Sequence, residues 1–378
     1  MRIENGFWTD LEQVPQIGDA GADLVLVFGT REQLCTRDLT ARLQAQFPQA
    51  VIVGCSTAGQ FIGPDLTDDG LALTAVTFES SRVEMTARRM ASAQHSDEVG
   101  RKIGASLRSP DLRAVLILSD GTGCNGSALV EGLREELPVD VTIFGGLAAD
   151  GADFNETVVL SGGLVGAGVV AAVGFYGDAL QIRTGSEGGW EQFGPERTIT
   201  ASEGAVLHRL DDEPALDLYS RYLGDRAGEL PGSALLFPLA VRAPGADPSL
   251  AVVRTILGVD QDDSSMTFAG NLPIGWKAQL MRASFDALID GAEDAGLSLG
   301  ASDTDETESP GLCIGVSCVG RRLVLGQRTD EELDAVIDAL PADSVFTGFY
   351  SYGELAIGLS GQCELHNQTM TLTLISER

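Results

Sequence analysis

The chain has 378 residues, of which 44% are hydrophobic, so it can build a large core and is long enough for two domains. Its 55 acidic residues against 25 basic ones give a formal net charge of −30, which argues against binding to nucleic acid or to an anionic membrane surface. No apolar run approaches the ~20 residues that span a bilayer. The first residues also lack the pattern of a signal peptide, so we expect a cytoplasmic protein.

The first part of the chain predicts alternating strands and helices. An apolar strand at 24–29 precedes a helix that carries Leu39, Leu43 and Phe47, and a second strand then ends in a glycine-rich stretch at 54–59. The following sequence predicts two neighbouring strands and a helix, at 71–80, 82–90 and 96–108.

A second strand–helix–strand unit occupies 113–150. Its helix at 127–137 repeats leucine at four-residue spacing, and the strand after it again runs into glycines. β-rich sequence continues from there, and a short helix at 214–224 is expected to close a domain. The stretch at 225–249 is rich in proline and glycine, which indicates a domain boundary.

The second half predicts a long helix with Met281, Phe285 and Leu288 on one apolar face. A third unit follows, with a strand at 312–318, a helix and a strand that begins at Val345. Thr329 and Glu332 have the spacing of a capping box at the start of that helix.

The expected fold class is α/β with mixed sheets. We predict two domains, 22–224 and 232–376, each a mixed β-sheet layered with helices, and related by internal duplication. An αββα sandwich, in which two sheets pack face to face, is the alternative arrangement.

One motif occurs twice, each time where a predicted strand ends. The pattern G-x-x-[ST]-x-G-[QE] is formed by Gly54, Thr57, Gly59 and Gln60, and again by Gly348, Ser351, Gly353 and Glu354. Ligands of α/β sheets bind at the carboxyl ends of strands, where glycine lets a ligand approach backbone N–H groups. Alternatively, the glycines only permit tight turns and close packing between domains.

Six segments in this order resemble the FIST domain proteins, which have an N-terminal and a C-terminal FIST module. They are VIVGCSTAGQF, FGGLAAD, GSEGGW, PALDLYSRYLG, GFYSYGELA and LHNQTMTLTLI. The resemblance implies a sensory input protein inside the cell that binds a small ligand, such as an amino acid or a similar metabolite. It also implies a separate signalling partner, such as a histidine kinase or a diguanylate cyclase.

The candidate ligand-binding residues lie mostly at the glycine-rich strand ends. Hydroxyl groups there stand beside backbone N–H donors, an aspartate can accept an ammonium group, and tyrosines can form the walls of a pocket. The candidates are Ser56, Thr57, Gly59, Gly145, Gly146, Asp150, Trp190, Tyr350, Tyr352, Glu354 and Asn367.

Two other functions remain as alternatives. Some FIST proteins are similar to haem proteins that respond to nitric oxide, and His366 is the candidate haem ligand, with Met370 expected on the same strand face. The family often has a histidine shortly before the Gly-Trp pair, where this chain has Glu187. A hydrolase would use Ser56 or Cys55 with His366 as the base, but the G-x-S-x-G pattern is absent.

We therefore predict no catalytic residue and expect a protein that is not an enzyme. The six cysteines form no C-x-x-C pair and are expected to be buried thiols of a reducing compartment, and their spacing predicts no metal site.

Overall fold

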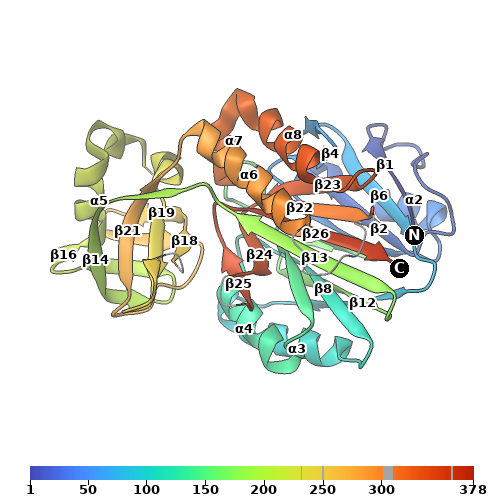
Figure 1. Cartoon of the computed structure of the whole chain (residues 1–378), viewed down its shortest axis with the longest axis horizontal. Helices are drawn as coiled ribbons and strands as arrows, with labels where there is room; N and C mark the ends of the chain where they lie inside the picture. Colours follow the sequence, from blue (N-terminus) through green and yellow to red (C-terminus); the bar gives the residue numbers. More distant parts are fainter. Residues whose placement is uncertain (231, 249–250, 301–309, 359–360) are drawn as a thin grey trace.

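The computed structural model describes residues 1–230, 232–248, 251–300, 310–358 and 361–378, which form a larger body and a smaller lobe (Figure 1). The described strands of the body form three six-stranded sheets, and those of the lobe form one eight-stranded sheet. Parallel and antiparallel pairs occur together with helices, so the predicted mixed α/β class is confirmed. No helix in these ranges is long and apolar enough to cross a membrane.

We number the three sheets of the body. Sheet 1 has the order β1-β6-β2-β3-β10-β11, sheet 2 has β7-β12-β8-β9-β24-β25, and sheet 3 has β13-β26-β22-β23-β4-β5. The strands are β1 Arg2–Trp8, β2 Leu24–Gly29, β3 Val51–Ser56, β4 Gln60–Ile62, β5 Asp65–Thr67, β6 Leu71–Thr77, β7 Arg82–Arg89, β8 Leu112–Ser119, β9 Thr142–Leu147, β10 Val159–Ser161, β11 Leu164–Gly166, β12 Val169–Tyr176, β13 Leu180–Glu187, β22 Leu312–Cys318, β23 Val345–Ser351, β24 Gly353–Ile357, β25 Cys363–His366 and β26 Met370–Glu377. The helices are α1 Arg31–Leu34, α2 Leu39–Gln46, α3 Ser96–Leu107, α4 Gly126–Glu136, α6 Phe285–Gly300, α7 Val319–Leu325 and α8 Thr329–Ala339.

The lobe is built from the chain between β13 and α6, and lies at the left of Figure 1. Its strand order is β18-β17-β21-β14-β15-β20-β19, with β16 paired to β15. Two chain connections join it to the body, one from β13 to β14 and one from β21 to α6. Its elements are β14 Glu191–Glu203, β15 Val206–Leu210, β16 Glu213–Pro214, α5 Ala215–Leu223, β17 Leu239–Arg242, β18 Val252–Arg254, β19 Ile256–Asp260, β20 Ser265–Phe268 and β21 Lys277–Arg282.

The three sheets of the body share one plan. Each contains a parallel pair of strands, β2–β3, β8–β9 or β22–β23, and the segment between the two strands carries helices. A later strand, β6, β12 or β26, pairs antiparallel with the first strand of the pair. These central strands are apolar and almost entirely buried, as expected for strands that are covered on both faces.

Each sheet is completed by a hairpin that comes from another sheet. The hairpin β4–β5 follows β3 of sheet 1 but pairs with β23 of sheet 3. The hairpin β10–β11 follows β9 of sheet 2 but pairs with β3 of sheet 1. The hairpin β24–β25 follows β23 of sheet 3 but pairs with β9 of sheet 2. The exchange of hairpins therefore closes a cycle through all three sheets.

The three sheets enclose one central core. Leu26, Leu116 and Ile314, from the first strands of the three parallel pairs, all belong to it. Phe28 of sheet 1 and Phe349 of sheet 3 meet there with their ring centroids 4.6 Å apart. Helices cover the outer faces, with α2 on sheet 1, α3 and α4 on sheet 2, and α6 and α8 on sheet 3. The arrangement differs from a sandwich of two sheets, because a third sheet shares the core.

The predicted boundary between domains falls inside the lobe, because the described residues 225–230 lie between α5 and β17. Three of the four described sheets combine strands from before and after this stretch. Sheet 1 alone is built entirely from the first half of the chain. The division into domains 22–224 and 232–376 stays a prediction.

Three local predictions are wrong. Met281 lies in β21 and not in the long helix, because α6 begins only at Phe285. Glu332 makes no capping box, because its carboxylate forms a buried ion pair with Arg321. Cys35 is an exposed thiol, since it follows the short surface helix α1, although all six cysteines are free as expected.

Glycine is required in the second strand of each parallel pair. A Cβ atom added to Gly54, Gly145 or Gly348 would lie within about 2 Å of a carbonyl oxygen of the neighbouring strand; the distances are 1.8 Å to Val27, 2.0 Å to Ile117 and 1.9 Å to Gly315. The opposite neighbour of each glycine is a residue of an exchanged hairpin. The glycines therefore allow the strands to approach one another where the hairpins join.

We expect Gly54→Ala to lower the free energy of unfolding by about 2–3 kcal/mol, because the added methyl group must push β2 and β3 apart. Denaturation followed by circular dichroism measures this loss. The matched control is Gly163→Ala, where nothing lies within 4 Å of the added Cβ, and it should change stability by less than about 1 kcal/mol. An unchanged unfolding midpoint for Gly54→Ala would contradict the packing role of this glycine.

Candidate functional site

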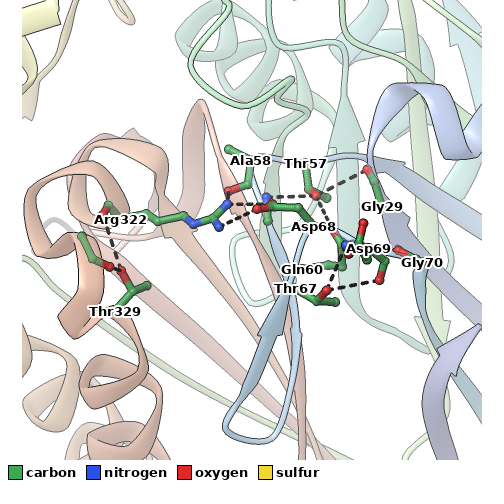
Figure 2. A network of polar contacts seen from close by, with 12 residues as sticks. Gly29, Thr57, Ala58, Gln60, Thr67, Asp68, Asp69, Gly70, Arg322 and Thr329 are labelled. Carbon is green, nitrogen blue, oxygen red and sulfur yellow. Dashed lines mark hydrogen bonds and ion pairs between the residues drawn. The ribbon is translucent and has the colours of Figure 1, made fainter. Parts of the chain in front are cut away.

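The two copies of the sequence motif make the same local hydrogen bond. The hydroxyl of Thr57 donates to Oε1 of Gln60 at 2.8 Å, and the hydroxyl of Ser351 donates to Oε1 of Glu354 at 2.6 Å. Figure 2 shows the first of these contacts. In both copies, the hydroxyl side chain orients a polar side chain three residues later, where the exchanged hairpin begins.

The far end of each oriented side chain contacts the strand that follows the hairpin. Gln60 Nε2 donates to the carbonyl of Gly70 at 2.8 Å, and Glu354 Oε2 accepts from the hydroxyl of Thr369 at 3.0 Å. Gly70 directly precedes β6 and Thr369 directly precedes β26, so the two contacts are equivalent. Both side chains are fully buried. The repeated motif thus connects an exchanged hairpin to the sheet that contains the strand before it in the chain.

Backbone hydrogen bonds join the ends of the second strands of the three parallel pairs. They form a closed cycle, in which Ala58 N donates to Tyr350 O at 2.9 Å, Ala149 N to Ser56 O at 2.8 Å and Tyr352 N to Leu147 O at 3.2 Å. All six residues are buried. We call these six residues the strand-end seam.

Several predicted ligand residues lie in or beside this seam and use their polar groups inside the protein. Ser56 Oγ accepts from the backbone N–H of Val158 at 3.0 Å. The Tyr350 hydroxyl donates to Glu332 Oε2 at 2.7 Å. Gly146 packs so tightly that a Cβ there would lie 2.7 Å from a side-chain carbon of sheet 3. These contacts hold the sheets together, which is the alternative role proposed for the glycine-rich strand ends.

Thr57 and Asp150 line a cavity of about 320 Å³ beside sheet 1. The Asp150 carboxylate accepts hydrogen bonds from the Tyr352 hydroxyl and from the backbone N–H groups of Asn155 and Glu156, the latter two at 2.9 and 2.8 Å. Asp150 therefore organises its own loop, and its carboxylate oxygens are already engaged.

The same cavity is closed on one side by Arg322 of α7. Its guanidinium donates to both carboxylate oxygens of Asp68 at 2.8 Å and also to the carbonyl of Ala58 (Figure 2). A Cβ added to Gly59 would lie 2.4 Å from this guanidinium, so the glycine is needed for the arginine to reach across. Arg322 thus connects α7 to the residues on either side of the hairpin β4–β5.

A cavity of about 460 Å³ lies between the body and the lobe, and we call it the interlobe cavity. The body strands β13, β24 and β25 and the lobe strands β14, β18 and β21 all contribute to its wall. Trp190 and His366 both line it, so the structure brings together two predicted residues that are far apart in the sequence. A groove of about 710 Å³ near the end of α4 contains none of the predicted residues.

A tight turn fixes Trp190 in the wall of the interlobe cavity. Its indole Nε1 donates to the carbonyl of Gln368 at 2.8 Å. Gly189 has a φ of +69°, and a Cβ there would lie 1.9 Å from the carbonyl oxygen of Ala287 in α6. Gly189 therefore lets the chain pass directly against α6 as it leaves the body for the lobe.

The imidazole of His366 is neutral at physiological pH, because burial lowers its pKa to about 4. Although the residue as a whole is partly exposed, Nε2 is buried and has no hydrogen-bond partner among the described residues. Buried polar atoms rarely stay without a partner, so this atom is a candidate binding position.

Met370 does not share a strand with His366, so that prediction is wrong. The chain turns at Gln368, which has a φ of +64°, and His366 therefore ends β25 in sheet 2 while Met370 begins β26 in sheet 3. Asn367 lies in this turn and is buried at the joint between body and lobe. Its Oδ1 accepts from the backbone N–H of Thr255 at 3.5 Å, but it is not among the residues that line the interlobe cavity.

Sequence reasoning missed Glu364. It lies two residues before His366 in β25, so both side chains project from the same strand face, and both line the interlobe cavity. Glu187, an exposed residue, supplies a second carboxylate to the wall, and its pKa is raised by partial loss of its surrounding water and by the nearby Asp294 carboxylate. The period-two alternation of β25 was the signal that could have identified Glu364 together with His366.

A buried ion pair ties both lobe connections to the body. Arg321 of α7 donates to Glu332 Oε1 at 2.5 Å, to the carbonyl of Gly188 at 2.6 Å and to the carbonyl of Leu288 at 2.7 Å. Gly188 lies in the first connection, and Leu288 lies in the first turn of α6, after the second. Because Glu332 also accepts from Tyr350, one network links the strand-end seam to the base of the lobe.

Comparison with protein families agrees with this architecture. The model of the FIST N domain matches residues 23–213, and the model of the FIST C domain matches residues 215–357. The chain belongs to the FIST family. No curated protein matches it. FIST domains are classed as sensory and signalling domains, and the interlobe cavity of this FIST protein takes wall residues from both matched regions, such as Trp190 and Met281.

Glu354 is a second unusual ionisable group of the FIST protein. Burial raises its pKa to about 8, from an ordinary value of 4.5. Between these two values the folded protein holds a proton that the unfolded chain has released, so stability falls as the pH rises through this window. Gln60 occupies the equivalent place in the other copy of the motif, which shows that a neutral amide suits this position.

We expect Glu354→Gln to be more stable than the wild type, by an amount that grows between pH 5 and pH 8 with a slope of up to about 1.4 kcal/mol per pH unit. Chemical denaturation at a series of pH values measures this difference. Glu12→Gln, at an exposed carboxylate, should leave the wild-type pH profile unchanged. Parallel profiles for Glu354→Gln and the wild type would show that Glu354 is ionised throughout the range.

Proposed function

We propose that this FIST protein binds a small metabolite, such as an amino acid or a related compound, in the interlobe cavity. Binding would be passed to a separate signalling enzyme, such as a histidine kinase or a diguanylate cyclase. The observation that carries the proposal is the buried Nε2 of His366, which has no partner among the described residues and belongs to a residue on the wall of a cavity of about 460 Å³. Leaving such an atom unpaired costs roughly 1–3 kcal/mol, which a hydrogen-bonding ligand would recover.

The position of the cavity suits a sensor. A ligand there contacts the body and the lobe at once, so it favours one relative placement of the two parts over others. The joint around the cavity is polar, with hydrogen bonds from Gln368 Nε2 to the carbonyl of Leu235 and from Asn125 Nδ2 to Asn271 Oδ1, both at 3.0 Å. Water can replace such contacts, and joints of this kind between domains commonly allow movement.

The joint also contains buried polar atoms that lack partners among the described residues. They are Thr255 Oγ1, Asn367 Nδ2 and Gln368 Oε1. Each of these atoms would gain a hydrogen bond to water if the joint opened, so the closed arrangement gains little from them. A ligand that bridges the two sides would supply the missing stabilisation.

The network of Arg321 supports a route from the cavity to the outer surface. Arg321 donates to the carbonyl of Gly188, two residues before Trp190. Arg321 belongs to α7, which packs with α6 and α8 on the outer face of sheet 3. We propose that a movement of the lobe displaces these helices and that the partner enzyme binds to them.

A haem-based nitric-oxide sensor is the second candidate, and it is favoured by the same atom. A neutral imidazole is a ligand for haem iron, and Met281 offers a thioether on the same wall. Haem would supply the iron that binds the gas. The carboxylates of Glu187 and Glu364 fit a porphyrin poorly, because its bulk would bury their charges.

The hydrolase alternative gains no support from the geometry. Burial raises the pKa of the Cys55 thiol well above its ordinary value, so the nucleophilic thiolate is scarce. Ser56 is fully buried, and neither residue lines the interlobe cavity with His366.

We expect a thermal-unfolding screen of amino acids and related metabolites to find a stabilising ligand. At a hundredfold excess over Kd, a ligand should add about 2.7 kcal/mol to the free energy of unfolding. His366→Ala should weaken binding about tenfold, because the hydrogen bond to Nε2 is lost.

His208→Ala is the matched control, since His208 lies in β15 of the lobe and not on the cavity wall, and it should bind like the wild type. A ligand response that survives His366→Ala unchanged would contradict the proposed site. Protein from cells supplied with haem should show no Soret band. A Soret band that is present in the wild type and absent in His366→Ala would contradict the metabolite sensor and support the haem sensor.

A further inference from the structure

The interlobe cavity has a charge that discriminates between ligands. Its described wall residues include two carboxylates, Glu187 and Glu364, but neither lysine nor arginine. The imidazole of His366 is neutral and therefore adds no positive charge. An anion that entered the cavity would meet two negative groups and no cation on the wall.

Arg254 is the cation that lies behind this wall. Its guanidinium is buried and donates to the backbone carbonyls of Leu365, Val253 and Asn271, at 3.0, 3.1 and 3.4 Å. Its charge is near enough to Glu364 for the two to interact, but Arg254 does not line the cavity. With the Asp294 carboxylate near Glu187, carboxylates outnumber this single guanidinium, so a positive charge on a ligand would offset part of the excess negative charge.

The polar atoms of the wall are mainly acceptors of hydrogen bonds. The ionised carboxylates of Glu187 and Glu364 can only accept hydrogen bonds, and His366 Nε2 can accept one when the proton of the neutral ring is on Nδ1. The Trp190 N–H is occupied by the Gln368 carbonyl, so the indole offers its ring to the cavity. An aromatic face attracts cations.

The donors near this part of the wall are also committed elsewhere. The hydroxyl of Thr369 donates to Glu354 Oε2 at 3.0 Å, and the N–H of the same residue approaches the same oxygen at 3.3 Å. The rest of the wall includes apolar side chains, among them Val252, Met281 and Ile357. A ligand can therefore bury an apolar part against this wall while it donates to the carboxylates.

From this arrangement we infer that the interlobe cavity takes an organic monocation, a protonated amine or guanidine on an apolar group. The nitrogen would donate to His366 Nε2 and to the carboxylate of Glu364, and the apolar part would lie against Trp190 and Met281. The inference rests on the proposed ligand-binding role of this cavity and adds the chemical class of the ligand.

Three probes of matched shape and different charge test this class. They are phenethylamine, 2-phenylethanol and 3-phenylpropanoate, which carry a positive charge, no charge and a negative charge at pH 7. Calorimetric titration at constant ionic strength should give a Kd for the amine about tenfold lower than for the alcohol, with the carboxylate weaker still. A carboxylate or an alcohol that binds as tightly as the amine would overturn the inferred class while still supporting the cavity as a binding site.

Two variants locate the charge. Glu364→Gln should raise the Kd of the amine about tenfold and change that of the alcohol less than about twofold, because only the amine uses the negative charge. Glu187→Gln should also raise the Kd of the amine. It serves as the test variant if Glu364→Gln fails to fold. Glu12→Gln, away from the cavity, should bind all probes like the wild type.

An affinity for the amine that neither variant reduces would overturn the inference. So would a failure of all three probes to bind. The thermal-unfolding screen of metabolites then tests the proposed function separately. A ligand that stabilises the wild type but not His366→Ala would support the sensory role with a different ligand chemistry.

Discussion

The cyclic exchange of hairpins among the three sheets is the constraint on which the rest of the structure depends. Because each parallel pair of strands accepts its outer neighbour from another sheet, the ends of the three second strands must meet. The glycines in those strands, the hydroxyl–amide and hydroxyl–carboxylate pairs of the repeated motif, and the contact between Arg322 and Asp68 all serve this meeting point. In this structure, the contacts of the motif that suggests a binding loop in the sequence are contacts that join sheets.

The interlobe cavity is positioned by the same framework. Arg321 connects the Tyr350 end of the strand-end seam, through Glu332, to the backbone at Gly188 just before Trp190. The other wall depends on β25, which belongs to an exchanged hairpin and places Glu364 and His366 on one face. Both halves of the site therefore depend on contacts between parts of the chain that are far apart in sequence.

Much of the local structure follows from sequence patterns. Apolar runs that end in glycine predict the strands correctly, and leucine spacing predicts α4, because these signals depend only on neighbouring residues. The pairing of the hairpins is not predictable in this way, because β4–β5 and β10–β11 are short and their partners lie far along the chain. Trp190 and His366 became candidates through the resemblance to FIST proteins, whereas Glu364 was missed because its strand is only four residues long.

The place of β26 in sheet 3 has a consequence for biosynthesis. It lies between β13 and β22, yet the ribosome delivers it only after the whole lobe and the strands β22–β25 have been made. Until then, β13 has no partner in that sheet, and the apolar residues that β26 covers stay accessible to chaperones and proteases. A nascent chain that stops before β26 therefore leaves part of its central core uncovered, which favours aggregation or degradation of incomplete copies.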